Sequence, residues 1–388
     1  MNYPLATTRE KIIVAAYSLF CFFLLSIYSP WNFMPSMIGA QYADMIGEPF
    51  NVLRSDLRVR AFNPLLATLV GINPYGWNYF LYFCLVLGSV YFSFYFLREN
   101  FALALLIPST IITTWISHAC NLWPGYPDIL CLIPLGLALT TRSTPLSLFF
   151  LAAGILSHEA ALFFLPFVLL YRHFYLAKID IKSRPVIYFL VFLFLYFSIR
   201  IFLSLRGDFY SISVYFYCLL GKTSPRATEP GRVLGTGFKN LFSLKNLFFS
   251  WGLWLIFPIA GLYKLARGEK AKIFVWAAYA VGFLMIFVDP GDYERRFLYL
   301  AIPVIGSFRI LFRQYSKPQA LLVAIMAAAH FFIPGHFCRQ GAVLAAERIE
   351  KTIVDIRQNG IPRRLEYFPF KRMHPYEEEK EMPAQPSH

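Results

Sequence analysis

Ionisable residues of the types that catalysis needs occur in four groups, each beside a long apolar stretch. The groups are Asp44, Glu48, Arg54, Asp56, Arg58 and Arg60; His118 and Asp128; His158 and Glu159; and Asp289, Asp292, Glu294, Arg295 and Arg296. A carboxylate can act as a general base on a hydroxyl or amine acceptor. Arginines can bind a phosphate and stabilise the charge that develops as it leaves. With apolar surroundings for a lipid chain, these residue types suggest group transfer from a lipid phosphate donor.

Structural roles could account for three of the four groups. Asp44 and Glu48 are spaced i, i+4, so they could form the solvated face of a short interfacial helix over 37–46. Asp128 follows a proline and begins an apolar stretch, as a helix-capping residue does. The acids and arginines of the fourth group could be turn residues and interfacial anchors.

His158 and Glu159 are harder to explain structurally, because apolar residues flank them on both sides over 145–171. One helix over this stretch would be about 40 Å long at ~1.5 Å per residue, longer than a hydrocarbon core of about 30 Å. It would place a charge near the bilayer centre and put Arg142 and Arg172 on opposite faces of the membrane. We therefore predict a hairpin of two short helices.

The predicted hairpin turns at residues 157–159. Ser157 would cap the second helix, and Glu159 would sit favourably at the positive end of that helix. We expect Glu159 to be ionised, accessible to water in a wet cavity and close to the loop that carries Asp44.

The composition indicates a membrane protein. Hydrophobic residues make up 57% of the 388 residues and charged residues 15%, against roughly 25% charged in a soluble domain. Apolar stretches cover 12–28, 77–97, 101–118, 127–141, 145–157, 159–171, 185–204, 243–263, 272–288, 297–313 and 319–334. Several are shorter than the ~20 residues that span a bilayer. We predict an all-α, polytopic integral membrane protein of about 11 transmembrane or half-membrane helices, with an outward-facing cavity.

The distribution of positive charge predicts a topology. With the N-terminus in the cytoplasm, the inner segments are 1–11, 98–100, 142–144, 172–184, 264–272 and 309–317. These segments are rich in Lys and Arg, as the positive-inside rule requires. The net charge of +14 therefore reflects topology, and we expect no nucleic acid partner. The lack of any Asn-x-Ser/Thr sequon favours a bacterial inner, or cytoplasmic, membrane.

Two parts of the chain differ in composition. We expect a membrane domain over 1–334, with a first outer loop at 29–60 and a second at 205–242. The second loop contains several Pro and Gly residues and should be irregular. The tail over 335–388 is charged, and we expect it to be partly disordered.

Two segments resemble GT-C type membrane glycosyltransferases. The run Tyr42-Ala43-Asp44, followed by Arg58-Val-Arg60-Ala-Phe-Asn-Pro64-Leu-Leu-Ala67, is similar to the first outer loop of that family. The run Leu156-Ser-His158-Glu159-Ala-Ala-Leu-Phe-Phe-Leu-Pro166 resembles a His-Glu helix turn in related bacterial membrane proteins. The similarity is one of layout over roughly residues 10–313. It implies a catalytic carboxylate in the first outer loop and a polyprenyl-phosphate-linked sugar as donor.

The resemblance implies roles for the candidate residues. Asp44 would be the catalytic base, with Asp56 as the second choice. The residues expected to bind the donor phosphate are Arg58, Arg60, Arg295 and Arg296. Those expected to line the cavity and orient the substrate are Asp128, His158, Glu159, Asp292 and Glu294. The sequence assigns no cofactor and no metal ligand, and it leaves a divalent metal and the oligomeric state open.

The reaction expected from this resemblance is inverting transfer of one hexose or pentose to an acceptor on the extracytoplasmic face. Its partners would be membrane lipids and the polyprenyl-phosphate sugar donor. Two alternatives use the same residues: a non-enzymatic transporter, flippase or export component for a surface polysaccharide, and a structural partner in a polysaccharide complex. A transporter needs polar groups that are reachable from both faces, whereas the predicted inner segments are short and basic.

Overall fold

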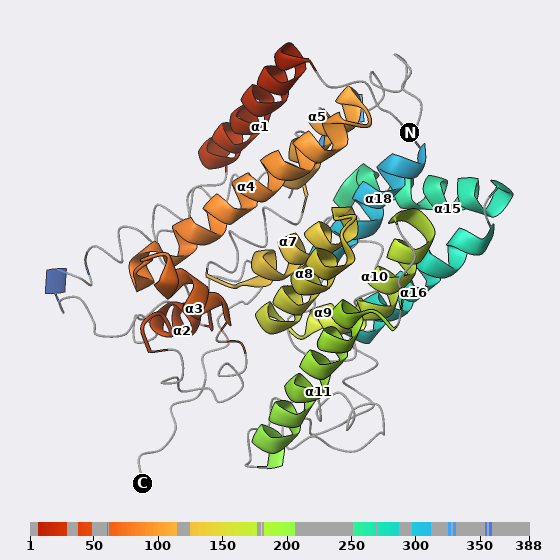
Figure 1. The fold of residues 1–388 in the computed structure, drawn as a ribbon. Coiled ribbons are helices and arrows are strands. Elements are labelled where there is room, and N and C mark those ends of the chain that lie inside the picture. Colours follow the sequence, from red (N-terminus) through yellow and green to blue (C-terminus); the bar gives the residue numbers. More distant parts are fainter. Residues whose placement is uncertain are drawn as a thin grey trace, which may run out of the picture.

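The computed structural model shows a helical protein (Figure 1). It describes residues 7–28, 38–48, 60, 62–114, 125–176, 180, 182–205, 251–268, 270–286, 297–311, 325–326, 329–330, 354 and 357–358. None of these described residues forms a strand, so the all-α prediction is confirmed for them. The second outer loop, the last apolar stretch and the tail fall almost wholly outside the described residues.

The helices follow the predicted apolar stretches closely. The longer helices are α1 (Thr8–Tyr28), α4 (Trp77–Leu97), α5 (Phe101–Ile112), α7 (Asp128–Thr140), α8 (Thr144–Ser157), α11 (Arg184–Leu205), α15 (Ile256–Gly268), α16 (Lys270–Ile286) and α18 (Ala301–Leu311). The short elements are α2 (Ile38–Asp44), α3 (Phe62–Leu69), α9 (Ala160–Phe163) and α10 (Leu165–Tyr171), the 3-10 turns η2 (Pro74–Gly76), η4 (Gly252–Leu255) and η5 (Phe297–Leu300), and the π-helical η3 (Arg172–Leu176). The short interfacial helix expected over 37–46 is present as α2.

Polar residues between the apolar stretches set several helix ends. Asn100 caps α5, because its side-chain oxygen accepts a hydrogen bond from the Ala102 backbone N–H at 2.8 Å. Asn73 does the same for η2, where its side-chain oxygen lies 2.7 Å from the Gly76 nitrogen. The helix boundaries are therefore encoded by single capping residues as well as by the apolar pattern.

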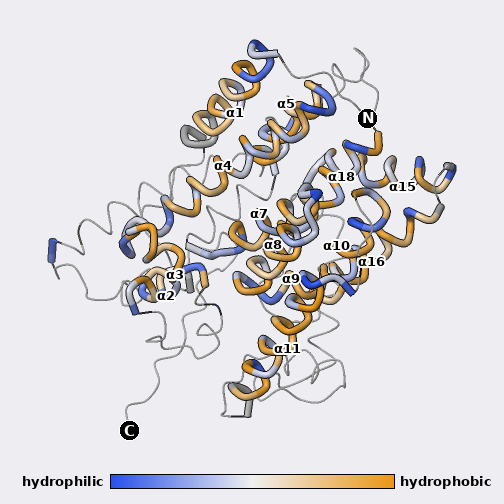
Figure 2. The backbone as a smooth tube through the Cα atoms, viewed as in Figure 1, coloured by the Kyte–Doolittle hydropathy of each residue, from blue (hydrophilic) through white to orange (hydrophobic). Residues whose placement is uncertain are grey.

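Two of the described helices are long and apolar enough to cross a membrane, Pro74–Leu97 and Arg184–Phe202. Five shorter apolar helices are Phe101–Ile112, Asp128–Thr140, Thr144–Ser157, Ala271–Ile286 and Phe297–Leu311. Figure 2 shows apolar residues along most of α11 and hydrophilic residues near helix ends, such as the start of α1 and the end of α15. Only 17% of the apolar window of α11 is buried against the rest of the protein, so most of this helix needs an apolar environment outside it.

Charged residues from distant segments meet at one end of the helix bundle. Arg309 lies 2.7 Å from the carboxylate of Glu99 and donates to the Tyr171 hydroxyl at 3.2 Å. Arg172 donates to the backbone carbonyl of Arg142 at 3.0 Å. These five residues define what we call the basic end. All of them except Tyr171, which directly precedes Arg172, come from segments predicted to be cytoplasmic.

The opposite end brings together segments predicted to lie outside. The indole N–H of Trp77, at the start of α4, donates to the Gly125 carbonyl at 2.7 Å. Gly125 has a φ of +89°, a backbone conformation that favours glycine. The side chain of Asn63 in α3 lies 2.8 Å from the Ser157 hydroxyl at the end of α8. We call this the site end, defined by Trp77, Gly125, Asn63 and Ser157.

Aromatic rings fill the core between α10, α16 and η5. Phe164 stacks on Tyr279 with ring centroids 5.4 Å apart, and Phe167 contacts Trp276 at 5.5 Å. The hydroxyl of Tyr279 donates to the Tyr299 carbonyl at 2.9 Å. This packing fixes the second arm of the hairpin and hence the position of its tip.

Candidate functional site

The chain breaks between α8 and α9 at His158. This residue has an extended backbone, with φ −159° and ψ 132°, directly after α8 ends at Ser157. The chain then runs back through α9 and α10, because Arg172 at the far end contacts the carbonyls of Thr141 and Arg142. The predicted hairpin is therefore confirmed, and a single helix over 145–171 is excluded.

The turn is held by a different cap from the one expected. The prediction that Ser157 caps the second helix is wrong, because its hydroxyl lies 2.8 Å from both the Ala153 carbonyl and the Asn63 side chain. Instead the Ala160 backbone N–H donates to Nδ1 of His158 at 3.1 Å. Since Nδ1 accepts this bond, a neutral His158 carries its proton on Nε2.

Glu159 lies between two arginines that come from distant parts of the chain. Arg60 holds the carboxylate in a two-point contact, with Nε 2.8 Å from one oxygen and Nη2 against the other. Arg200 of α11 contacts the first of these oxygens at 3.1 Å. The His158 ring adds a longer contact of 4.0 Å. Two guanidinium groups thus share one carboxylate, which leaves the trio with an excess of one positive charge.

Glu159 is ionised but not open to water. Burial opposes the charge, yet the positive charges of Arg60 and Arg200 outweigh burial and hold the pKa of this carboxyl well below its usual range. Glu159 lies between α8 and α9, outside the two helices long enough to cross a membrane. Only 4% of its surface is exposed, so the expectation of water access is wrong. The physical reason is that the two arginines replace water as its hydrogen-bond donors.

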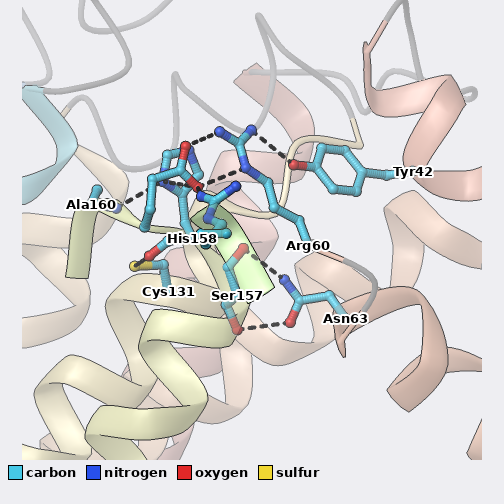
Figure 3. A network of polar contacts seen from close by, with 9 residues as sticks. Tyr42, Arg60, Asn63, Cys131, Ser157, His158 and Ala160 are labelled. Carbon is cyan, nitrogen blue, oxygen red and sulfur yellow. Dashed lines mark hydrogen bonds and ion pairs between the residues drawn. The ribbon is translucent and has the colours of Figure 1, made fainter. Parts of the chain in front are cut away.

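The first outer loop reaches this cluster through Tyr42. Nη1 of Arg60 donates to the Tyr42 hydroxyl at 3.2 Å, which links α2 to the hairpin tip (Figure 3). Tyr42 is buried, together with Ala40, Ala43 and other apolar residues of α2, α3 and α4. Asp44 is the last residue of α2 and partly exposed. The candidate base therefore lies two residues after a direct partner of Arg60.

Asp128 begins α7 at the same end of the molecule. Its surface is only 6% exposed, and it is the first residue of the helix, directly after Pro127 at the N-cap position. Three residues later, the Cys131 thiol lies 3.9 Å from the His158 carbonyl, so the first turn of α7 packs on the hairpin tip. Asp128 thus occupies the first turn of α7, where a negative charge is favourable, and Pro127 occupies the N-cap position.

The remaining candidates cannot be placed. Those outside the described residues are Asp56, Arg58, Asp292, Glu294, Arg295 and Arg296. Sequence reasoning also missed Arg200, whose surface is only 3% exposed. A signal was present, because Arg200 is an ionised residue within an otherwise apolar stretch and such residues are functional candidates.

Metal binding finds no support in the described part of the chain. There, no group of three or more His, Cys, Asp or Glu side chains could hold a metal ion. The cluster of Arg60, Glu159 and Arg200 instead has the chemistry of an anion site, because arginine pairs bind carboxylate and phosphate alike.

No family model, curated protein or solved structure matches this chain. The residues and their geometry therefore carry the functional argument alone.

Proposed function

We propose that this chain is a polytopic membrane enzyme that transfers a sugar from a polyprenyl-phosphate-linked donor to an acceptor on the extracytoplasmic face. The observation that carries the proposal is that a buried Glu159 is held between a buried Arg200 and a half-buried Arg60 at the site end, beside the helix that bears Asp44. Buried ionised groups in an apolar protein are costly and are usually kept for function.

The membrane location is supported by the exterior of the helices. Side chains such as Phe194, Ile201 and Phe202 on α11 are more than half exposed, as are Phe83 of α4 and Phe149 of α8. In water these surfaces would be an aggregation risk, whereas lipid solvates them. The shorter helices fit crossings or half-crossings, and the basic end fits the cytoplasmic face.

Each residue of the cluster has a role in this proposal. Arg60 and Arg200 bind the donor phosphate, and Glu159 is the internal anion that occupies them when the donor is absent. Because phosphate and carboxylate accept the same two-point contact from a guanidinium, the donor exchanges with Glu159. His158 and Glu159 then orient the sugar, and Asp44 takes the proton from the acceptor hydroxyl or amine.

Turnover of a labelled donor tests the proposal. Membrane vesicles that contain the full chain receive polyprenyl-phosphate donors with a radiolabelled hexose or pentose, and label leaving the lipid extract for an acceptor is counted. Replacing Asp44 by Asn keeps the shape and removes the base, so transfer should fall on the order of 10²-fold. The matched control is Asp180→Asn, an exposed acid, which should transfer label as the wild type does.

Three results would redirect the assignment. Full activity in Asp44→Asn with collapse in Asp56→Asn moves the base to Asp56. Donor that crosses the vesicle membrane unchanged supports a flippase. Absence of both transfer and crossing, for every donor tested, contradicts the proposed function.

A further inference from the structure

A second site candidate lies away from the charged cluster, in a cavity between α4, α7, α10, α16 and α18. Together with the space at its mouth it encloses about 850 Å³. Its walls are almost entirely apolar and include Leu85, Ile133, Phe167 and Ile305. None of the described candidate site residues lines it. This apolar cavity is therefore distinct from the wet, outward-facing cavity predicted beside residues 157–159.

Two glycines open the space between these helices. A Cβ atom on Gly136 would lie 2.4 Å from the ring of Phe92, and one on Gly306 would lie 2.4 Å from the ring of Trp276. Real Cβ atoms do not approach a neighbour that closely, so any larger residue would displace these rings. The two rings therefore lie directly on glycine backbone and form walls of the cavity.

Apolar walls offer a buried water molecule few hydrogen-bond partners. A buried water needs two to four polar partners, and an apolar cavity of sufficient size stays dry and binds hydrocarbon instead. The enclosed part of the cavity has a volume of about 100 Å³, similar to an apolar cavity of ~150 Å³ that stays dry and binds benzene. A hydrocarbon chain is therefore the occupant that matches both the volume and the lining.

The charged part of the lining is at the basic end. Arg309 lines the cavity with its side chain 27% exposed, while it contacts Glu99 and Tyr171. Arg98 and Arg142, both exposed, follow two residues after lining residues of α4 and α7. Cations outnumber acids around this opening, which suits an anionic head group.

We propose that this cavity binds the hydrocarbon chain of an amphiphile whose anionic head group lies at Arg309. The ligand enters from the basic end, opposite the Arg60–Glu159–Arg200 cluster. The inference rests on the proposed membrane location and not on sugar transfer. A fatty acid or acyl lipid and a polyprenyl phosphate share this chemistry.

Quenching of Trp276 fluorescence by bromine tests the cavity, because Trp276 lines it and is only 7% exposed. Dibromostearate is titrated into the full-length protein in detergent, and the same titration on Trp276→Phe is subtracted to isolate the signal of Trp276. The expected result is saturable quenching. Ala301→Leu and Ser89→Leu fill the cavity, so quenching should be lost in these variants. Quenching should persist in the control Ala280→Leu, which adds a leucine on an exposed face of α16.

Several outcomes are decisive. Equal quenching in the filled variants, with their folding verified by gel filtration and thermal unfolding, overturns the cavity assignment. Equal quenching by the uncharged methyl ester overturns the role of Arg309. Competition by polyprenyl phosphate identifies an isoprenoid chain, and competition by oleate alone identifies an acyl chain. Because no sugar is present, failure of this experiment is distinct from failure of the transfer assay.

Discussion

Glu159 is a single buried carboxylate shared by two arginines, the buried Arg200 and the half-buried Arg60. Its removal takes away the carboxylate that Arg60 and Arg200 share, whereas removal of Arg200 leaves the Arg60–Glu159 pair intact. Breaking a buried ion pair by deleting one partner costs about 3–5 kcal/mol, mainly because the remaining charge stays desolvated. The three residues should therefore respond very differently to substitution.

Glu159→Gln should lower the stability of the folded protein by about 3–5 kcal/mol, whereas Arg200→Met should cost much less. The measurement is thermal unfolding of the purified protein in detergent, together with protein abundance in membranes. Combining the two changes should recover part of the loss, because the double variant removes one of the two uncompensated charges. Equal losses of stability in both single variants would show that packing, and not charge balance, determines the contribution of these residues.

Arg60→Lys should weaken binding of a lipid-phosphate donor. Arg60 contacts Glu159 through two nitrogens and Tyr42 through a third, and the single ammonium group of lysine cannot reproduce that fork. Binding of polyprenyl phosphate to the purified variant provides the measurement, with Arg267→Lys on the exposed end of α15 as control. Unchanged donor affinity in Arg60→Lys would leave this arginine with a structural role only.

The hairpin of α8, α9 and α10 packs against α16 at a glycine. A Cβ atom on Gly282 would lie 2.2 Å from the Phe163 carbonyl oxygen, which belongs to the backbone and cannot rotate away. Helix α16 can therefore approach the break between α9 and α10 only without a side chain at this position.

Gly282→Ala should destabilise the protein by about 1–3 kcal/mol, since the two elements must move apart. Thermal unfolding provides the measurement. Gly268→Ala is the matched control, because nothing lies within 4 Å of its added Cβ atom. A Gly282→Ala variant as stable as the control would show that the hairpin and α16 adjust freely.

The hairpin could be predicted from the sequence because the length of the apolar stretch and the positive charges that flank it suffice to exclude a single helix. The stretch over 145–171 is too long for one crossing. The positive-inside rule places Arg142 and Arg172 on the same side of the membrane. The cap could not be predicted, because Ser157 and His158 are adjacent and both can accept from a backbone N–H. The local sequence does not show that Asn63, far away in the chain, engages Ser157.

The described residues form two chemically different ends, the basic end and the site end. Helix order was predictable because apolar stretches are long and their boundaries carry charge. Helix α3 was missed, since Phe62–Leu69 is too short to read as a crossing. Arg200 was missed because its partner Glu159 is distant in sequence, and only tertiary packing brings the two together.

Cysteine labelling tests the orientation of the whole molecule. In a background without other cysteines, Tyr75→Cys at the site end should react with an impermeant reagent added to intact cells. Ser183→Cys, directly before α11, should react only after the membrane is permeabilised. Labelling of Ser183→Cys in intact cells would reverse the predicted topology.

If the proposed membrane location holds, the shared carboxylate also bears on the order in which the helices assemble. Translation delivers Arg60 first, then Glu159, and Arg200 last. Before α11 arrives, Arg60 and Glu159 form a neutral pair. Helix α11 then brings an additional cation, Arg200, into an apolar setting, which is costly without a counter-charge. The carboxylate of Glu159 offsets this cost, because it forms an ion pair with Arg200. Biogenesis of α11 thus depends on a finished hairpin, and a chain with a defective tip would present Arg200 to the quality-control proteases of the membrane.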